Sequence, residues 1–253
     1  NANVRETFDL FKTSDFKERV LEWALENIGK AQRLVHIVTT YLAEPPANGV
    51  ILRRSALVTL LSFLEILFED LFFVYFHYVN PNGTSTEEKA RKKAKGIQGW
   101  KKRIEKVKSF GVQLHGVEDY LDEFYEIAER RNRIVHGDGV ITKEYIEKIP
   151  VEYQSDGSGE GRILIVSTRY LFRAFHLITL IAFQTCQIAW REWRPNKSSK
   201  KANEALERFV FSTLIQRRYD LVKDLASVSG GVILSRRYKQ FVIVNHAIAL
   251  REL

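Results

Sequence analysis

Three residues of the chain, Arg131, Asn132 and His136, have the types and the spacing that chemistry on a phosphodiester requires. A histidine takes up and releases protons near neutral pH, and the planar charged group of an arginine matches phosphate oxygens. RNA supplies its own nucleophile, the 2′-hydroxyl, so a base, an acid and a cation suffice without a metal ion or another cofactor. The pattern predicts RNA cleavage with His136 as base or acid. Arg131 would stabilise charge developing at phosphorus, and Asn132 would position the substrate or His136.

These residues belong to a segment with helical periodicity that runs from residue 120 to residue 135. Asn132 and His136 are four residues apart in it and therefore share one face of the helix. Gly137 and Gly139 follow, and we expect them to end the helix, because glycine adopts the left-handed conformation that helix C-termini favour.

Arg131 falls on the apolar stripe of this helix and needs a partner, because an unpaired buried charge is very costly. The apolar helix expected at 50–78 carries one narrow polar stripe, formed by Ser62, Glu65 and Glu69. This stripe either reaches solvent at a packing gap or faces the helix of Arg131. In the second arrangement Glu65 would hold Arg131 and Ser62 would support the same site. A salt bridge and a helix cap without catalysis remain the structural alternative.

The motif Arg131-Asn132-x-x-x-His136 resembles the Arg-x4–6-His signature of HEPN domains, in which a polar residue, often Asn, follows the arginine. Glu65 resembles the acidic residue that the family often carries near that arginine. The resemblance implies an all-helical fold and, as in many members, a metal-independent endoribonuclease of a toxin–antitoxin or phage-defence system. In the family the motif lies at a dimer interface. The resemblance therefore also implies a homodimer with one composite RNA-cleaving site, and an antitoxin or other defence protein as a partner.

The resemblance covers roughly residues 14–195 and is sharp only at 131–136. The segment Val244–Leu250 also resembles the tail of some defence-associated members. Asp138 departs from the pattern, because toxins paired with a nucleotidyltransferase antitoxin often carry His-x-Tyr there. Control by tyrosine adenylylation is therefore not implied. The alternative function, from another class, is a non-catalytic helical module that binds RNA or a partner protein.

The positive charge of the chain is concentrated in one segment. Residues 89–108 contain ten Lys or Arg and one acidic residue, Glu105, so this segment carries a charge of +9, and the rest of the chain is nearly neutral, for a net charge of +8. Such clusters attract polyanions and steer their approach, although most charged runs are simply solvated helix faces. We therefore predict RNA as the partner of this segment, and the residues expected to contact it are Lys92, Lys93, Lys101, Lys102 and Arg103.

The predicted fold class is all-α, with a HEPN-like helical domain over 1–195 and a C-terminal helical appendage over 196–253. A small β-hairpin is expected at about 148–166, because two apolar runs flank a glycine-rich turn there. Helices are expected over 14 or 15 to 42, 50–78, 86–95, 100–110, 120–135, 168–194, 203–228 and 236–250.

The composition limits the other classes of function. The single cysteine, Cys186, excludes an internal disulfide and fits a reducing cytoplasm, and the first twelve residues hold no signal-peptide pattern. The apolar stretch Leu171–Trp190 is interrupted by polar residues, so we expect a buried or partner-facing helix and not a membrane span. No Cys/His metal cluster or dinucleotide fingerprint occurs in the sequence. A cytoplasmic protein without a membrane partner is the resulting expectation.

Overall fold

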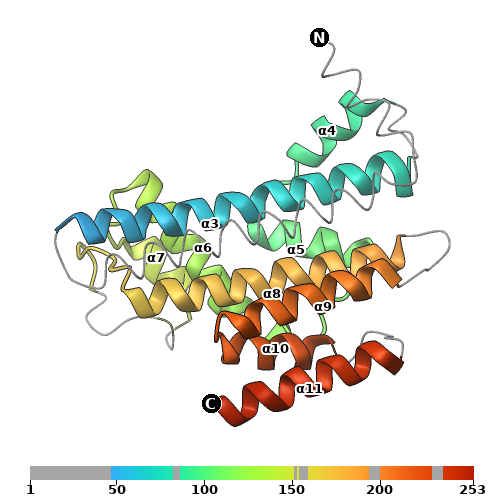
Figure 1. The fold of residues 1–253 in the computed structure, drawn as a ribbon. Helices are drawn as coiled ribbons and strands as arrows, with labels where there is room; N and C mark the ends of the chain where they lie inside the picture. The colour runs from blue at the N-terminus through green and yellow to red at the C-terminus, as the bar shows by residue number, and fades with distance from the viewer. Residues whose placement is uncertain (1–46, 82–85, 151–152, 154–158, 194–199, 230–235) are drawn as a thin grey trace, which may run out of the picture.

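The computed structural model describes residues 47–81, 86–150, 153, 159–193, 200–229 and 236–253, and the expected first helix at 14–42 lies outside them (Figure 1). The described residues are mostly helical and contain no β-strand, which agrees with an all-α fold. In chain order the elements are α3 (Ala47–Val74), a π-helical turn (Tyr75–Val79), α4 (Glu87–Lys95), α5 (Trp100–Ser109), a 3-10 turn (Glu118–Tyr120), α6 (Leu121–His136), α7 (Lys143–Lys148), α8 (Thr168–Glu192), α9 (Lys200–Ile215), α10 (Tyr219–Ser229) and α11 (Arg236–Glu252).

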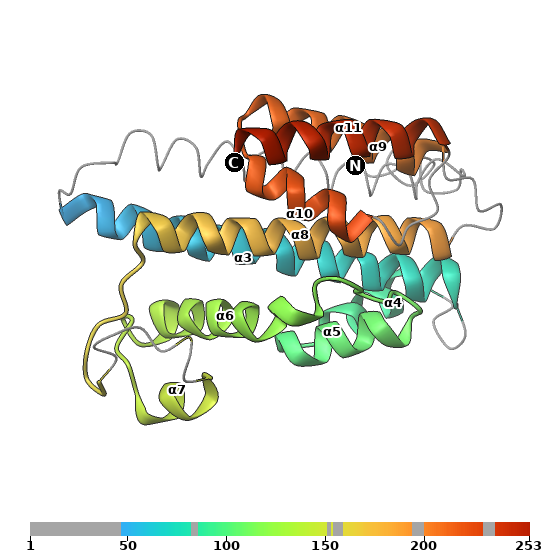
Figure 2. The ribbon, with the colours of Figure 1, turned by 90° about the horizontal axis from the view of Figure 1, so that it is seen from below.

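Two long helices, α3 and α8, lie side by side in the middle of the molecule (Figures 1 and 2). Helix α3 is apolar nearly all round, which is typical of a central helix, and it buries Leu57, Phe68 and Phe72 completely. Helices α4, α5, α6 and α7 lie on one side of this pair, and α9, α10 and α11 lie on the other. The helix that carries the motif, α6, is therefore positioned from one side by the core pair.

Three helices begin at residues that cap their first turn. The side-chain oxygens of Thr86, Thr142 and Ser167 each accept a hydrogen bond from the backbone N–H three residues later. Such caps satisfy one of the N–H groups that a helix leaves without an intrahelical partner. They determine where α4, α7 and α8 start, and α8 begins at the predicted residue, Thr168.

The expected β-hairpin is not present among the described residues. Residues of the expected second arm instead lie beside the chain just after α6, where Val140 and Ile163 form a single antiparallel bridge. Ile141 N donates to the carbonyl of Arg162 at 2.7 Å, and Leu164 N donates to the carbonyl of Gly139 at 2.8 Å. Residues 143–148 form α7, and much of the expected first arm, 149–153, lies outside the described residues. The second arm therefore pairs with the segment that follows the motif.

Helix α8 is buried along most of its length, which confirms the prediction for Leu171–Trp190. Its polar interruptions are paired: Arg173 binds Glu123 of α6, and His176 binds Asp224 of α10. Among the described residues α8 is the one helix long and apolar enough to cross a membrane, but 83% of its most apolar window is buried inside the protein. The polar pairs connect α8 to the layers on both sides.

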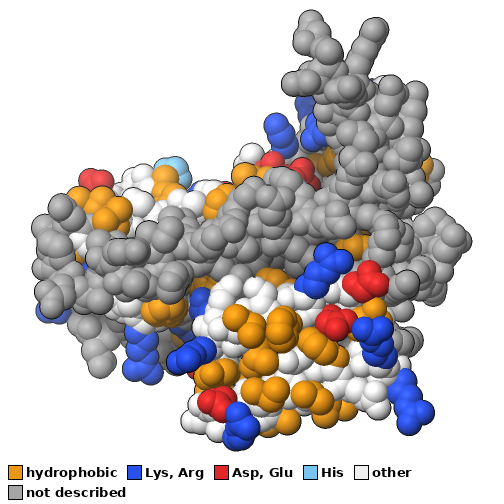
Figure 3. All heavy atoms as spheres, viewed as in Figure 1, with side chains coloured by type: hydrophobic (Ala, Val, Ile, Leu, Met, Phe, Trp, Pro, Cys, Tyr) orange, Lys and Arg blue, Asp and Glu red, His pale blue; other side chains and the backbone are white. Residues whose placement is uncertain are grey.

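The C-terminal helices share the core of the rest of the molecule. Phe183 of α8 stacks on Phe209 of α9 with ring centroids 4.9 Å apart, and Leu225 of α10 is completely buried in the same cluster. Hydrophobic side chains also gather on the outer face of these helices, as Figure 3 shows. The exposed members of that face include Phe211, Ile215, Ile243, Val244 and Leu250.

Candidate functional site

Helix α6 ends at the motif through a left-handed turn. The backbone N–H groups of Gly137 and Gly139 both donate to the carbonyl of Arg133 at 2.9 Å. Gly137 has φ −151°, so the prediction that it is left-handed is wrong, whereas Asp138 (φ 53°) and Gly139 (φ 77°) take that conformation. A Cβ atom on Gly139 would lie 3.0 Å from Nη2 of Arg54. The turn therefore requires glycine at 139, both for its backbone angle and for the approach of Arg54.

Arg131 is held by the acidic residue predicted for it. Its Nη2 donates to Oε2 of Glu65 on α3 at 3.1 Å, and its Nη1 donates to Oδ1 of Asn132 at 3.3 Å. The side chains of Arg131 and Glu65 are 16% and 30% exposed, so the pair is accessible to solvent from one side. Nε of Arg131 is buried and has no acceptor. The guanidinium is thus fixed in direction, but its donors are not all used.

His136, in contrast, is exposed at the last position of α6. Its ring makes no hydrogen bond or ion pair with another residue of the described part of the chain. Asn132 lies one helical turn before it on the same face and is half-buried. The three motif residues therefore run from the partly buried Arg131 to the open His136, where a substrate has access.

The polar stripe of α3 faces the layer of α5 and α6, and only one of its members contacts the motif. Glu65 binds Arg131, whereas Ser62 donates to the carbonyl of Val58 in its own helix at 2.9 Å. Glu69 accepts a hydrogen bond from Nη2 of Arg103 on α5 at 3.3 Å. Ser62 therefore makes no direct contact with the motif residues in this structure.

Arg103, which was predicted to contact RNA, does not lie on the exposed surface. Its side chain is buried, with 5% of the residue exposed, and its Nη1 donates to the backbone carbonyl of Glu65 at 3.1 Å. Trp100, Arg103, Ile104 and Val107 share the inner face of α5, at the spacing of one helical stripe. A guanidinium that is buried and already paired is not available to RNA. Through its hydrogen bond to the backbone of Glu65, Arg103 instead supports Glu65.

The other four predicted RNA-binding residues are exposed on α4 and α5, namely Lys92, Lys93, Lys101 and Lys102. Helix α5 packs against the first half of α6, where the rings of Trp100 and Phe124 are 5.0 Å apart. Phe124 and His136 are separated by about 18 Å along the helix, at about 1.5 Å per residue. The basic surface therefore lies near the opposite end of α6 from His136 (Figure 2).

A buried polar network on the other side of α6 was missed by sequence reasoning. Nε of Arg130 donates to Oε1 of Glu126 at 2.7 Å, and its Nη1 donates to the carbonyl of Ile165 at 2.8 Å. The hydroxyl groups of Tyr145 and Tyr170 donate to the two oxygens of Glu126 at 2.6 and 2.7 Å. The guanidinium of Arg130 also lies 4.0 Å from the ring centroid of Tyr170. This network joins α6 to α7 and α8.

The network changes the acidity of its members. Burial, and next the negative charge of Glu126, raise the pKa of Tyr145 and of Tyr170 above the ordinary value. Burial by itself lowers the pKa of Arg130, but Tyr170, Glu126 and Tyr145 outweigh it and raise that pKa. Glu126 and Arg130 are four residues apart on α6, and this spacing was the one signal of the pair in the sequence.

Other reactive groups do not gather into another candidate site for catalysis within the described ranges. No group of three or more His, Cys, Asp or Glu side chains there is arranged to hold a metal ion. Burial raises the pKa of the Cys186 thiol to about 12, which suits a core residue and not a nucleophile. No protein-family model, curated protein or solved structure matches this chain.

Proposed function

We propose that this protein is a metal-independent endoribonuclease of the HEPN type, belonging to a toxin or anti-phage defence system. The observation that supports the proposal best is the arrangement at the end of α6. There Arg131, tethered by Glu65 at 3.1 Å, lies in the last turns of the helix that ends at the exposed His136. In the proposed reaction the 2′-hydroxyl attacks phosphorus, the bond to the leaving 5′-oxygen breaks, and a 2′,3′-cyclic phosphate forms.

The tether of Arg131 suits a role in binding the reacting phosphate. A guanidinium has five N–H donors, and the described contacts of Arg131 use one on Nη1 and one on Nη2. Its Nε has no acceptor. A cation with a fixed direction and spare donors can stabilise charge on phosphate oxygens without reorganising during the reaction. Glu65 therefore acts as a positioning residue, and Arg131 as the group that contacts the phosphate.

The proposal includes a homodimer, because cleavage requires two proton transfers. One proton leaves the 2′-hydroxyl and another reaches the 5′-oxygen, and a single His136 performs only one transfer in one step. Two chains related by a two-fold axis would supply both histidines and both arginines. Apolar side chains exposed around this end of α6 offer a surface for pairing, and they are Val135, Val140, Ile163 and Ile165.

The exposed lysines of α4 and α5 are the proposed contact for the RNA backbone beyond the cleavage site. Because they lie toward the start of α6 and His136 ends it, the bound strand would run along this helix. Replacing Lys92, Lys93, Lys101 and Lys102 with Gln should flatten the salt dependence of RNA binding by about 0.7 in slope per lost phosphate contact. An unchanged slope would mean that the lysines form only a solvated face.

A non-catalytic module that binds RNA or a partner protein is the second candidate. The observation in its favour is that His136 lacks a hydrogen bond to another described residue. Catalytic bases are commonly oriented by a third group. In the proposed dimer this orienting group would come from the RNA or from the second chain. In a binding module no such group is required, and His136 could be replaced without loss of affinity.

The test is RNA cleavage in the presence of a metal chelator, with identification of the product ends. Wild-type protein should leave 2′,3′-cyclic phosphates, and His136→Ala should lose activity by about 100-fold or more, the usual contribution of a general acid or base. His115→Ala is the matched control, because His115 is also an exposed histidine (82% of its side chain) but lies in the loop before α6. Strict dependence on Mg²⁺, or full activity of His136→Ala, would refute the proposal.

A mixing experiment tests the composite site. Wild-type and His136→Ala chains are unfolded together and refolded at varied ratios, so that mixed dimers form. If both histidines are needed at one site, activity should fall faster than in proportion to the wild-type fraction. A proportional decrease, or a monomer by light scattering at the assay concentration, would contradict the shared site.

A further inference from the structure

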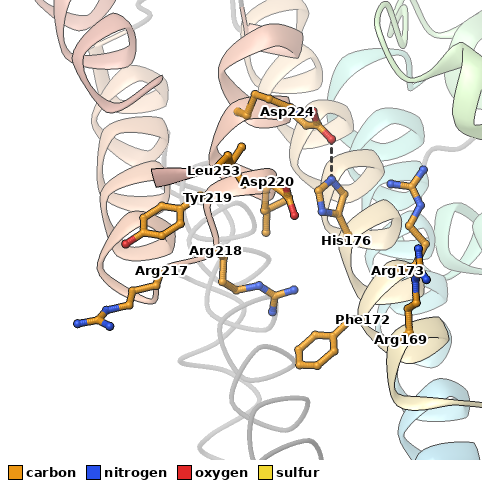
Figure 4. Close-up of a pocket in the computed structure, with 12 residues that line it drawn as sticks. Arg169, Phe172, Arg173, His176, Arg217, Arg218, Tyr219, Asp220, Asp224 and Leu253 are labelled. Carbon is orange, nitrogen blue, oxygen red and sulfur yellow. Dashed lines mark hydrogen bonds and ion pairs between the residues drawn. The ribbon is translucent and has the colours of Figure 1, made fainter. Parts of the chain in front are cut away.

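A concave site that does not include the motif residues lies between α8 and the turn that joins α9 to α10 (Figure 4). This pocket has a volume of about 520 Å³, which is in the range of small-molecule sites. Phe172 and His176 line it from α8, and Arg217, Arg218 and Asp220 line it from the turn and the start of α10. None of the motif residues is part of its lining in the described chain.

Arg218 is the feature that shows what the pocket is suited to bind. Its guanidinium lies 4.3 Å from the ring centroid of Phe175 and 5.4 Å from that of Phe172, and it points toward Phe172 and His176 in Figure 4. It forms no ion pair with a carboxylate of the described residues, and burial lowers its pKa to about 10. A desolvated cation without a counter-charge is unfavourable, and an anion in the pocket would relieve that cost.

The remaining charges of the pocket leave an excess of positive charge. Asp224 is already paired with Nε2 of His176 at 2.8 Å and lies 3.9 Å from Nζ of Lys223. Arg173 is neutralised by Glu123 of α6 through two contacts of 2.8 and 2.7 Å. Of the charged lining residues without an ion pair to a described residue, Arg169 and Arg218 are cations and Asp220 is an anion, whereas Arg217 points away from Arg218 and His176 (Figure 4).

Two further features of the pocket indicate which class of anion it is suited to bind. Helix α10 begins at Tyr219 in the wall of the pocket, and the first N–H groups and the dipole of an eleven-residue helix favour a phosphate. Phe172 is 39% exposed, so a face of its ring is available to a flat group. A phosphate monoester carries about two negative charges at pH 7 and would supply the counter-charge that Arg218 lacks.

We propose that this pocket binds a small phosphate monoester that carries a planar ring. Arg218 and the start of α10 hold the phosphate, and Phe172 packs against the ring. The bound molecule contacts both α8 and α10, so it joins the core pair to the C-terminal helices. This site is independent of RNA cleavage, and binding is measured without any activity assay.

Adenosine 5′-monophosphate is the probe, and its binding to the full chain is measured by titration calorimetry and by the shift of the thermal unfolding midpoint. Binding should raise the midpoint, because a ligand that binds only the folded state stabilises it. Three compounds show what each part of the probe contributes to binding. Adenosine lacks the phosphate, ribose 5-phosphate lacks the planar ring, and inorganic phosphate is the anion alone. All three should bind more weakly than the probe. Absence of probe binding at millimolar concentration, or equal binding of adenosine, would overturn the proposal.

Neighbouring arginines provide matched variants. Arg218→Gln should weaken binding of the probe by about tenfold or more, the usual effect of losing a charge-assisted hydrogen bond. Arg217→Gln should change it little, since the side chain of Arg217 points away from Arg218 and His176 in Figure 4. If Arg218→Gln does not fold, Phe172→Ala, which leaves both arginines in place, should still weaken binding of the probe but not of inorganic phosphate. Unchanged affinity of the folded Arg218→Gln protein would exclude the assigned role.

Discussion

Two adjacent arginines on α6, Arg130 and Arg131, have opposite environments. Arg130 is 4% exposed, its charge is balanced by the buried Glu126, and it also binds a backbone carbonyl and the face of Tyr170. Arg131 is 16% exposed, and its partner Glu65 is 30% exposed. Its Nε has no acceptor. Arg130 is enclosed by the fold, whereas the guanidinium of Arg131 is partly accessible to a ligand.

This difference follows from the geometry of a helix, because consecutive side chains point about 100° apart at 3.6 residues per turn. One face of α6 holds the helix against α7 and α8 through the network of Glu126 and Arg130. Neither Arg131 nor His136 belongs to that face, since they lie about 100° and 120° from Arg130 in opposite directions around the helix axis. The residues that hold α6 in the fold and the residues proposed for the reaction therefore lie on different sides of the helix. Substitutions can change stability or activity independently.

The largest effect on stability is expected from Glu126→Gln. The variant keeps the shape of the side chain but leaves the charge of Arg130 buried without a counter-charge. The free energy of unfolding should fall by about 3–5 kcal/mol, as is usual when one partner of a buried pair is removed. Urea unfolding followed by circular dichroism measures it. A loss below about 1 kcal/mol would show that Arg130 is not charge-paired in the way described.

Alkaline pH provides the second test of the buried face. The pKa values of Tyr145 and Tyr170 are raised in the folded protein, so above the ordinary value of about 10 the unfolded chain loses protons that the folded chain keeps. Stability is therefore complete below pH 10 and decreases as pH rises beyond it. Each tyrosine contributes a slope of up to about 1.4 kcal/mol per pH unit.

The measurement is the urea midpoint of wild-type protein and Tyr145→Phe between pH 8.5 and 11. The variant loses a hydrogen bond to Glu126 and should be less stable at every pH, but its decline above pH 10 should be shallower. Parallel declines for the two proteins would mean that the hydroxyl of Tyr145 does not retain its proton in the folded state.

The two faces also differ in how far the sequence predicts them. Helical periodicity placed Glu65 on a polar stripe but left its partner open, and the resemblance of the motif to HEPN domains favoured Arg131. Their ion pair is confirmed. Tyr145 and Tyr170 are 19 and 44 residues from Glu126, and no periodic pattern connects positions so far apart. The buried network depends on tertiary packing, and residues that meet only in the folded chain leave no local signal.

Two errors have simple physical causes. Arg103 was assigned to the RNA-binding face from the charge of its segment, although the apolar stripe of α5 includes its position. Net charge describes a segment, whereas burial is decided by the face of the helix. The β-hairpin at about 148–166 was predicted from two apolar runs around a glycine-rich turn, but residues 162 and 164 hydrogen-bond to 139 and 141 instead, because an apolar run does not specify its partner.

A smaller loss of stability is expected when the solvent-accessible ion pair between Arg131 and Glu65 is broken. Glu65→Gln should lower the free energy of unfolding by about 0.2–1 kcal/mol, the range of solvent-exposed pairs, and added salt should reduce the difference from wild type. If the proposed function holds, the same variant loses cleavage activity, because Arg131 is no longer held in one direction. A loss of stability as large as that of Glu126→Gln would remove the distinction between the two faces.

The smallest effect on stability is expected at His136, the residue with the largest proposed effect on activity. Its side chain is exposed and makes no hydrogen bond within the described chain, so its removal leaves no buried group without a partner. His136→Ala should change the free energy of unfolding by no more than about 0.5 kcal/mol, as for surface positions in general. Urea unfolding of His136→Ala beside His115→Ala measures this directly. A loss above about 1 kcal/mol would mean that the motif supports the fold, and the binding module would then be the better explanation. If His136→Ala keeps the urea midpoint of the wild type but loses cleavage, then the reaction requires a side chain that the fold does not require. Stability and activity would then depend on different residues of α6.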